Sequence, residues 1–501
     1  MRTKKFYITT PLYCVSGKPH LGHAYTTLAA DILARHLRTR DIPVHLQTGT
    51  AEHCPDIEEI AKGRNMAPGD WCGAVSADFR ALWKTLNIEY DQFIRTSDPA
   101  CTDGVQAAFE KLLKSGDIRK GPAPGRYCPA CETFYDEAEL KGKNCPVHGR
   151  PAEQVGGEAY FFRLSGHEGA LLRHYAKHPD FLSPPGRAQE LVNSVKAGLK
   201  DISVARPGTA WGVPVRSDPG HTVHAWFSAL LNYAAGPGYN PDRGSQDFQS
   251  LWPADVHLAG RGSFRLHGVI WPALLLSLGL ELPRKVYAHG WWTINGGKMS
   301  RSKGNFIQAE DVVRDYGVDA LRYFLFREVP FGEDGEFSAE ALRRRYNADL
   351  AGELGRLCSR VMTLAGKYLE HRLPRKPEGS EIFKELSAWT QEIHRSTEAL
   401  RFSDALESIW RAAGRLNRLI DEKKPWEMEK KEPAALRPFL NEMVWCLRLV
   451  AGWLDPYMPD TASKMHLQLG VGMTPGGVEP QNLPALFPRK HDGKPGDPLH
   501  N

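Results

Sequence analysis

Pro19-His20-Leu21-Gly22-His23 stands between a predicted strand at 6–10 and a predicted helix at 24–35. The strand is a run of β-branched and aromatic residues, and the helix carries its apolar residues on one face. Two imidazoles and a glycine therefore lie at a helix N-terminus, where unpaired backbone N–H groups and the helix dipole favour anions such as phosphate. The alternative interpretation is a strand–turn–helix whose histidines merely cap the helix.

Composition limits the class of protein. A chain of 501 residues exceeds what one compact core usually holds, so we expect about two to four domains. The net charge of +5 is slight and neither demands nor excludes a nucleic-acid partner. No secretory signal opens the chain, and its most apolar run, 269–279, is too short to span a bilayer, so no membrane partner is expected. Nine cysteines, scattered outside one cluster, favour a reducing cytoplasm over a disulfide framework.

Strand and helix patterns alternate after the histidines. A buried strand at 44–50 runs into the turn Gly49-Thr50-Ala51-Glu52-His53, and helical patterns begin at about Asp56 and recur at 76–86 and 104–115. This alternation is typical of a parallel α/β sheet, in which ligands bind at the carboxyl ends of the strands. We therefore expect His20 and the turn at 49–53, which both follow such strands, to line one ligand crevice.

A cysteine cluster interrupts this pattern. Cys128 and Cys131 are followed after thirteen residues by Cys145 and His148, the spacing of two zinc knuckles that donate two ligands each. Three thiolates and one imidazole suit a closed tetrahedral site, which predicts a structural Zn²⁺ rather than a catalytic one. The alternative is four unrelated residues.

The α/β pattern resumes at 201–207 and continues through 223–233 and 256–260, before an amphipathic helix that carries His267. A loop then reads Gly296-Gly297-Lys298-Met299-Ser300-Arg301-Ser302-Lys303-Gly304-Asn305. Small residues, hydroxyls and cations at this density predict a mobile loop that wraps a polyphosphate, with charge from Lys298 and Arg301. The alternative is a solvated basic turn.

From Ser338 the period becomes helical, with amphipathic runs at 338–367, 382–399, 403–422 and 434–452. These runs predict an antiparallel helical bundle. The last thirty residues are rich in proline and glycine, which predicts an irregular tail.

The His-Leu-Gly-His and Lys-Met-Ser-Arg-Ser elements resemble the two signatures of the class I aminoacyl-tRNA synthetases. The run at 6–11, the cysteine cluster, Trp226-Phe227 with Tyr233, and Asn417-Arg418 with 424–427 look like the methionyl-tRNA synthetase family, in order along nearly the whole chain. The resemblance implies an α/β Rossmann-type (HUP-like) catalytic domain with a zinc-binding insertion and a C-terminal α-helical bundle. The expected parts are the catalytic domain at 1–116 and 201–337, the insertion at 117–200, an anticodon-binding-like bundle at 338–470 and a tail at 471–501.

The resemblance also implies the chemistry. A substrate carboxylate attacks the α-phosphate of ATP, which releases pyrophosphate and leaves an aminoacyl-adenylate. The residues implied as catalytic are His20, His23, Lys298 and Arg301, and those implied to bind ATP add Gly22, Ser300 and Ser302. Positioning and preorganised charge supply the rate, and Mg²⁺ accompanies the ATP.

The amino-acid pocket departs from the family pattern. The family's ammonium-binding aspartate is replaced by Ala51, a glycine by Cys54, a second aspartate by Ser228, and a tyrosine by Cys14. Losing one partner of a buried ion pair costs about 3–5 kcal/mol. The family's Gly-Lys-Asp-Ile has become Gly260-Arg261-Gly262-Ser263, whereas Trp226, Tyr233 and His267 remain at pocket-matching positions. Leu12 and Ser263 are also assigned to the pocket. This pattern predicts an amino acid other than methionine; the alternative is a methionyl enzyme with a compensating contact, for which Glu52 is the candidate.

The acceptor is ambiguous at this level. Trp426 and Arg360 match the family's anticodon contacts, but Arg356 replaces an expected asparagine, so these residues are possible RNA contacts. An aromatic residue in a bundle is also a common core residue. Relatives such as the methionyl-type domain of hydrazine synthetases pass the acyl group to a small nucleophile, and here a partner protein would supply the remaining step.

The leading hypothesis is therefore an adenylate-forming ligase with a non-methionine amino acid and a small-molecule acceptor. The alternatives are a methionine–tRNA ligase and a catalytically silent paralogue that binds tRNA or a partner. The family's appended dimerising domain has no match in this sequence, so a monomer is expected.

Overall fold

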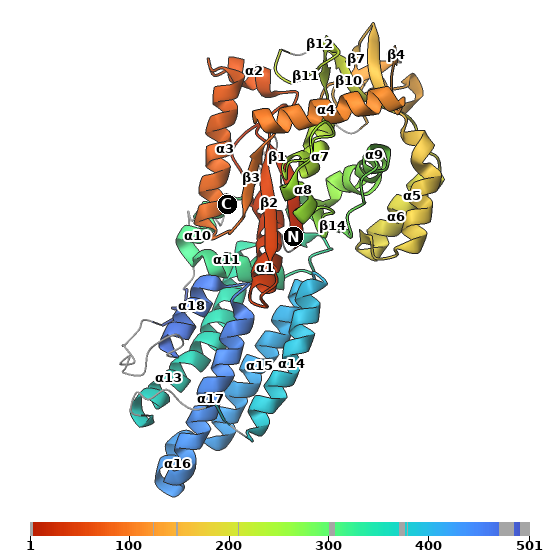
Figure 1. Ribbon diagram of the computed structural model, residues 1–501. Helices are drawn as coiled ribbons and strands as arrows, with labels where there is room; N and C mark the ends of the chain where they lie inside the picture. The colour runs from red at the N-terminus through yellow and green to blue at the C-terminus, as the bar shows by residue number, and fades with distance from the viewer. Residues whose placement is uncertain are drawn as a thin grey trace. The chain divides into compact units, whose positions relative to one another are not determined.

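The computed structural model describes residues 4–123, 125–146, 149–208, 210–299, 306–369, 376–377, 379–469 and 485–490, without the side chain of Lys298. The chain divides into two compact units (Figure 1). Unit 1 comprises Met1–Pro19, Asp41–Lys84 and Glu89–His289, and unit 2 comprises His20–Arg40, Thr85–Ile88 and Gly290–Asn501.

A six-stranded parallel sheet forms the centre of unit 1. Its strand order is β3-β2-β1-β13-β14-β9, and every neighbouring pair is parallel. The strands are β1 (Phe6–Cys14), β2 (Val44–Ala51), β3 (Gln92–Arg95), β9 (Leu182–Ser183), β13 (Val256–Gly260) and β14 (Val286–His289). Strand order runs outward in opposite directions from β1 and β13, so the topological switch point lies between these two strands. The predicted parallel α/β sheet is confirmed.

Helices surround this sheet within unit 1, and their ends follow from local sequence. Helix α4 has Asp98 at its N-cap and Pro99 in its first turn, and it ends at Gly116, whose φ of 77° is the left-handed C-cap conformation. The helices are α2 (Ile57–Lys62), α3 (Pro68–Thr85), α4 (Pro99–Ser115), α5 (Glu168–Lys177), α6 (Pro185–Lys196), α7 (Ala225–Ala235), α8 (Gln246–Leu251) and α9 (Trp271–Leu278), the last preceded by a π-helical turn at Leu266–Ile270.

Two antiparallel sheets complete unit 1. The first has the order β11-β12-β10-β8-β4, and the second, β6-β5-β7, carries the cysteine cluster. Their strands are β4 (Ile118–Pro122), β5 (Arg126–Cys128), β6 (Thr133–Tyr135), β7 (Glu153–Gln154), β8 (Glu158–Phe162), β10 (Ile202–Pro207), β11 (Val213–Val215) and β12 (Asp218–Val223). The five-stranded sheet therefore takes β4 and β8 from the segment 117–200 and its other strands from residues that follow.

Unit 2 is mainly helical, and its core is the predicted bundle. Helices α13, α14, α15 and α17 pack together, and the predicted helical run at 338–367 is continuous through a π-helical segment at Tyr346–Gly355 (Figure 1). The helices are α1 (Leu21–Arg38), α10 (Ala309–Tyr316), α11 (Val318–Arg327), α12 (Ala339–Arg345), α13 (Arg356–Tyr368), α14 (Glu381–Glu398), α15 (Phe402–Lys423), α16 (Pro425–Lys431), α17 (Pro433–Leu454) and α18 (Pro459–Gln468). Strands β15 (Trp292–Ile294), β16 (Gly297–Lys298) and β17 (Gly335–Glu336) form a small sheet.

A buried ion pair joins the elements of unit 2. Arg322 of α11 donates to the Asp31 carboxylate of α1 at 2.6 Å, and neither side chain is exposed. The same guanidinium donates to the backbone carbonyls of Pro456 and Tyr457, each at 2.9 Å. Arginine suits this position because its fixed fork of donors satisfies several acceptors at once.

In the part of the chain that the structure describes, no helix combines the length and the apolar character that crossing a bilayer requires.

Candidate functional site

His20 and His23 form an interlocking cap on α1 in unit 2. Nδ1 of His20 accepts a hydrogen bond from the N–H of Gly22 at 3.0 Å, and Nδ1 of His23 accepts from the N–H of His20 at 3.2 Å. The rings stack with centroids 3.9 Å apart. Because Nδ1 is the acceptor in both rings, the neutral imidazoles carry their proton on Nε2. The capping and anion-binding interpretations are therefore compatible, since each uses a different nitrogen.

Gly22 allows this arrangement. A Cβ at Gly22 would lie 2.9 Å from Cε1 of His20, closer than real contacts of this kind, so a larger residue would displace the imidazole. The glycine thus positions the His20 ring.

The residues that follow the second signature contact the first turn of α1. Lys298 ends β16, which pairs with β15; the side chain of Lys298 and the residues Ser300, Arg301 and Ser302 lie outside the described residues. After that gap, the carbonyl of Ile307 accepts a hydrogen bond from the N–H of Leu21 at 3.4 Å. Within unit 2, the residues after the loop therefore contact the first turn of the histidine-capped helix.

The carboxyl ends of β1 and β2 hold the predicted amino-acid pocket in unit 1. Cys14 is the register partner of Ala51, and Leu12 is that of Gly49. Leu12 and Ala51 are buried, 8% and 6% exposed, within one apolar cluster that also contains Tyr233. The sequence-predicted residues of these two strands are therefore brought together as expected.

Glu52 is fully committed to other partners. Its carboxylate accepts two hydrogen bonds from Arg95, at 2.7 and 3.0 Å, and others from Ser76 at 2.6 Å, Thr50 at 3.0 Å and Ser97. Burial acts to raise the pKa of Glu52, but the hydrogen bonds from Arg95 and the two serines hold it below its ordinary value. The ionised group is saturated, which argues against Glu52 as the compensating contact. No motif marked Arg95, Ser76 or Ser97, because they come from separate elements.

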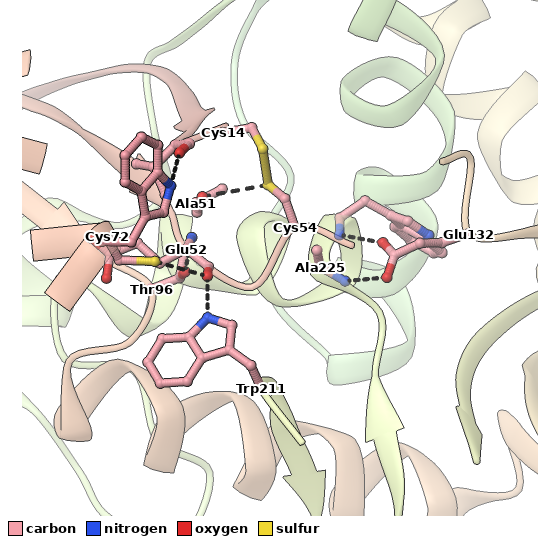
Figure 2. Close-up of a disulfide and its surroundings, with 12 residues drawn as sticks. Cys14, Ala51, Glu52, Cys54, Cys72, Thr96, Glu132, Trp211 and Ala225 are labelled. Atoms are coloured by element: carbon pink, nitrogen blue, oxygen red, sulfur yellow. Dashed lines mark hydrogen bonds between the residues drawn. A yellow bond between two sulfur atoms is a disulfide. The ribbon is translucent and has the colours of Figure 1, made fainter. Parts of the chain in front are cut away.

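The cysteine pattern favoured a reducing cytoplasm over a disulfide framework, and the structure contains one disulfide. Cys14 and Cys54 form a disulfide with a Cα–Cα distance of 6.2 Å across a sequence separation of 40 (Figure 2). The reason is strand register, because neighbouring parallel strands bring their carboxyl ends together and place the two residues beside Ala51. No other disulfide is present among the described residues.

Tyr233 and His267 form a hydrogen-bonded pair with a definite proton arrangement. Nδ1 of His267 lies 2.9 Å from the carbonyl of Ser263, which can only accept, so this nitrogen carries the proton. Nε2 of His267 therefore accepts from the Tyr233 hydroxyl at 2.8 Å. Burial lowers the pKa of His267 to about 4 and raises that of Tyr233, so both are neutral at neutral pH. The pair presents a polar group in an otherwise apolar cluster.

Of the remaining pocket candidates, Trp226 and Ser228 lie on α7, and Ser263 ends a short helical turn that follows β13. The Glu132 carboxylate accepts from the N–H groups of Ala225 at 3.0 Å and Trp226 at 3.4 Å, and so caps this helix (Figure 2). Trp226 is half-buried against the apolar cluster. The Ser228 hydroxyl is buried and has no hydrogen-bond partner among the residues that the structure describes. Ser263, by contrast, donates to the carbonyl of Gly260 at 3.2 Å.

Acidification should destabilise the protein through His267. Its folded pKa of about 4 lies below the ordinary 6.5, so the unfolded chain binds more protons between these values. We therefore expect the free energy of unfolding to be largest above pH 6.5 and to fall as pH drops from 6.5 towards 4. Denaturant melts at stepped pH measure this, and His267→Gln should flatten the slope; an unchanged slope would contradict the assignment.

Three thiols converge in the cysteine cluster. The sulfur atoms of Cys128, Cys131 and Cys145 lie within 4.8 Å of one another, while His148 lies outside the described residues. Three soft sulfur donors held this close fit a tetrahedral zinc site.

Metal removal tests this site. We expect about one equivalent of zinc per chain, lost on chelation together with thermal stability, because a closed site contributes to folding rather than to catalysis. Cys131→Ser should reduce the metal content measured by atomic absorption, whereas Cys101→Ser, at a buried free cysteine elsewhere, should retain it. Equal metal loss in both variants would argue against the cluster.

Trp426 is not a core residue. It lies on α16 with 47% of its surface exposed, and the Arg360 guanidinium lies 5.9 Å from its ring centroid. Arg360 also pairs with Asp421 at 2.6 Å, and Arg356 at the start of α13 is exposed. An exposed aromatic face beside an arginine is compatible with base stacking.

Comparisons with known proteins agree over nearly the whole chain. The family model described as tRNA synthetases class I (M) matches residues 6–158 and 145–362. The chain is 44% identical to a methionine–tRNA ligase of Caldanaerobacter subterraneus, over 97% of this chain and 79% of that protein. A methionine–tRNA ligase of Thermotoga maritima is 39% identical, over 97% and 78%. The methionyl-tRNA synthetase of Mycobacterium tuberculosis, solved with methionyl-adenylate, superposes with a TM-score of 0.89 at 35% identity, over 97% of this chain and 100% of that one.

Proposed function

This chain belongs to the class I tRNA synthetases, among the methionyl-type adenylate-forming ligases, and from this we propose that it is a methionine–tRNA ligase. The observation that carries the proposal is 44% identity to such a ligase over 97% of the chain. The relatives give no support to the predicted small-molecule acceptor or partner protein, and they favour methionine over the predicted non-methionine substrate.

The proposed reaction has two steps. An oxygen of the methionine carboxylate attacks the α-phosphate of ATP, and the bond to the departing pyrophosphate breaks. The Nε2–H groups of His20 and His23 would donate to the phosphate oxygens on which charge develops, and Lys298 and Arg301 would pair with the pyrophosphate. A terminal hydroxyl of tRNA then attacks the adenylate carbonyl and AMP leaves. Mg²⁺ bound with ATP would neutralise phosphate charge.

The other roles proposed here follow from the same resemblance. Gly22, Ser300 and Ser302 would contribute to the ATP site, the cluster at 128–148 would hold structural zinc, and Arg356, Arg360 and Trp426 would contact the anticodon. The same proposal includes the domain boundaries given above and a monomeric state. It also includes a cytoplasmic location, because ATP and tRNA are used in the cytoplasm.

A second candidate, adenylation of a different amino acid, is favoured by one specific observation. Ala51 supplies no carboxylate for a substrate ammonium group, and Glu52 beside it is saturated by Arg95 and its other partners. An unpaired ammonium group in a buried site is costly.

ATP–pyrophosphate exchange over a panel of amino acids, with and without tRNA, distinguishes these proposals. Exchange with methionine alone, followed by tRNA charging, supports the methionine–tRNA ligase. Exchange with another amino acid supports the second candidate, and no exchange at all supports a silent paralogue. Ala51→Asp should lower the KM for methionine, because it restores a charge partner for the ammonium group.

A further inference from the structure

The Cys14–Cys54 disulfide lies in the wall of the amino-acid pocket. It joins the carboxyl end of β1 to the residue three positions beyond Ala51, and the Cys54 sulfur lies 3.4 Å from the Ala51 carbonyl (Figure 2). Cys54 also packs against the apolar cluster that contains Leu12, Ala51 and Tyr233. The state of this bond therefore bears directly on the shape of the pocket.

The backbone on either side of the disulfide is held independently of it. The Trp211 indole donates to the carbonyl of Glu52 at 2.6 Å, and the N–H of Glu52 donates to the Thr96 hydroxyl at 2.8 Å. On the β1 side, the Trp71 indole donates to the carbonyl of Val15 at 2.9 Å. Opening the disulfide would thus release the Cys14 and Cys54 side chains locally without unfolding the two strand ends.

The two disulfide-bonded residues are also more exposed than most other described cysteines. Cys14 and Cys54 are partly exposed, whereas Cys72, Cys101, Cys358 and Cys446 are buried. Burial raises the pKa of each of these four thiols to about 12, so they remain protonated and unreactive. Apart from the cysteine cluster at 128–145, Cys14 and Cys54 are therefore the described cysteines that a redox reagent can reach, and they lie at the pocket.

We propose that Cys14 and Cys54 form a reversible redox site that sets the affinity of the pocket for its amino acid, high when the disulfide is closed and low when it is open. The proposal rests on the proposed function, since it regulates that same pocket. A thiolate of a dithiol reductant attacks one sulfur, and the other cysteine leaves as a thiolate that takes a proton. The second thiol of the reductant resolves the mixed disulfide, which yields two protein thiols and an oxidised reductant. A low-molecular-weight disulfide reverses the exchange.

The main test measures exchange kinetics in buffers of reduced and oxidised dithiothreitol. We expect reduction to raise the KM for methionine about tenfold, within the usual range of coupling between two sites, with little change in kcat or in the KM for ATP. Coupling is reciprocal, so saturating methionine should shift the midpoint of the disulfide by about 30 mV towards the oxidised form. Alkylation of the reduced thiols followed by peptide mapping measures the fraction of open disulfide at each redox potential, and so gives the midpoint without enzyme turnover.

Matched variants separate this site from the other thiols. Kinetics of the double variant Cys14→Ala/Cys54→Ala should not respond to redox state, whereas Cys101→Ala should respond as the parent does. The proposal is overturned if the bond resists reduction until the protein unfolds, if reduction leaves the KM unchanged, or if the double variant still responds.

Failure of the proposed function gives a different result. If methionine is not activated, the same titration uses whichever amino acid supports exchange, and the redox proposal stands or falls on that KM. If no amino acid is activated in either redox state, there is no affinity to regulate and both proposals fail.

Discussion

Replacing His20 with asparagine will lower the kcat of ATP–pyrophosphate exchange by about two to three orders of magnitude, the usual cost of removing one donor to developing charge. Asparagine is among the best N-cap residues, so its side chain replaces Nδ1 as the acceptor for the N–H of Gly22. It cannot replace the Nε2–H donor. The thermal midpoint should therefore change little while activity collapses, and melting curves with exchange kinetics measure the two effects separately.

The matched control is His20→Ala, which removes both nitrogens. It should lose the same activity and, in addition, about 1 kcal/mol of stability because the helix cap is lost. If the asparagine variant retains near-parental kcat, His20 is only a cap and the proposed role in phosphate stabilisation is wrong.

Replacing Asp31 with asparagine will lower the free energy of unfolding by about 3–5 kcal/mol, because it leaves the Arg322 charge buried without its counter-charge. Arg322 is completely buried, and its remaining partners are backbone carbonyls, which do not neutralise a guanidinium. Arg35, whose side chain is 10% exposed, also loses its carboxylate partner but keeps its hydrogen bond to the carbonyl of Asn87 at 2.9 Å. Urea denaturation of the intact chain measures the change.

A double-mutant cycle with Arg322→Met isolates the pair, and the double variant should be less destabilised than the sum of the single variants. Glu392→Gln, at a half-exposed ion pair with Arg411 in the same unit, should change stability by less than about 1 kcal/mol. The explanation by burial of the charge pair would be wrong if the two substitutions had additive effects on the free energy of unfolding. It would also be wrong if Asp31→Asn and Glu392→Gln lowered that free energy equally.

Local sequence predicted the elements that local physics controls. The run at 6–10 extends through a buried parallel strand to Cys14, and the amphipathic pattern after His23 forms α1 with His20 as its cap. The spacing of Cys128, Cys131 and Cys145 predicted their convergence. In each case, the interactions that form the element join residues close in the chain. Side-chain periodicity and motif spacing are therefore sufficient to predict it.

The site departs from sequence reasoning where distant residues meet. The sequence singled out Glu52 as the carboxylate that could compensate for Ala51. In the structure, Arg95 of β3, Ser97 just after β3 and Ser76 of α3 all donate hydrogen bonds to that carboxylate and saturate it. Nor did the sequence connect Cys14 with Cys54, because their approach depends on the register of β1 against β2.

The sequence by itself determined the family, the parallel α/β and bundle organisation, and the helix that begins at the two histidines. Only the tertiary structure decided the surroundings of the residues proposed to form the amino-acid pocket: a saturated Glu52, a neutral Tyr233–His267 pair and a disulfide beside Ala51. The physical reason is that charge pairing, burial and disulfide formation depend on distances between side chains, and strand register sets those distances for residues far apart in the chain.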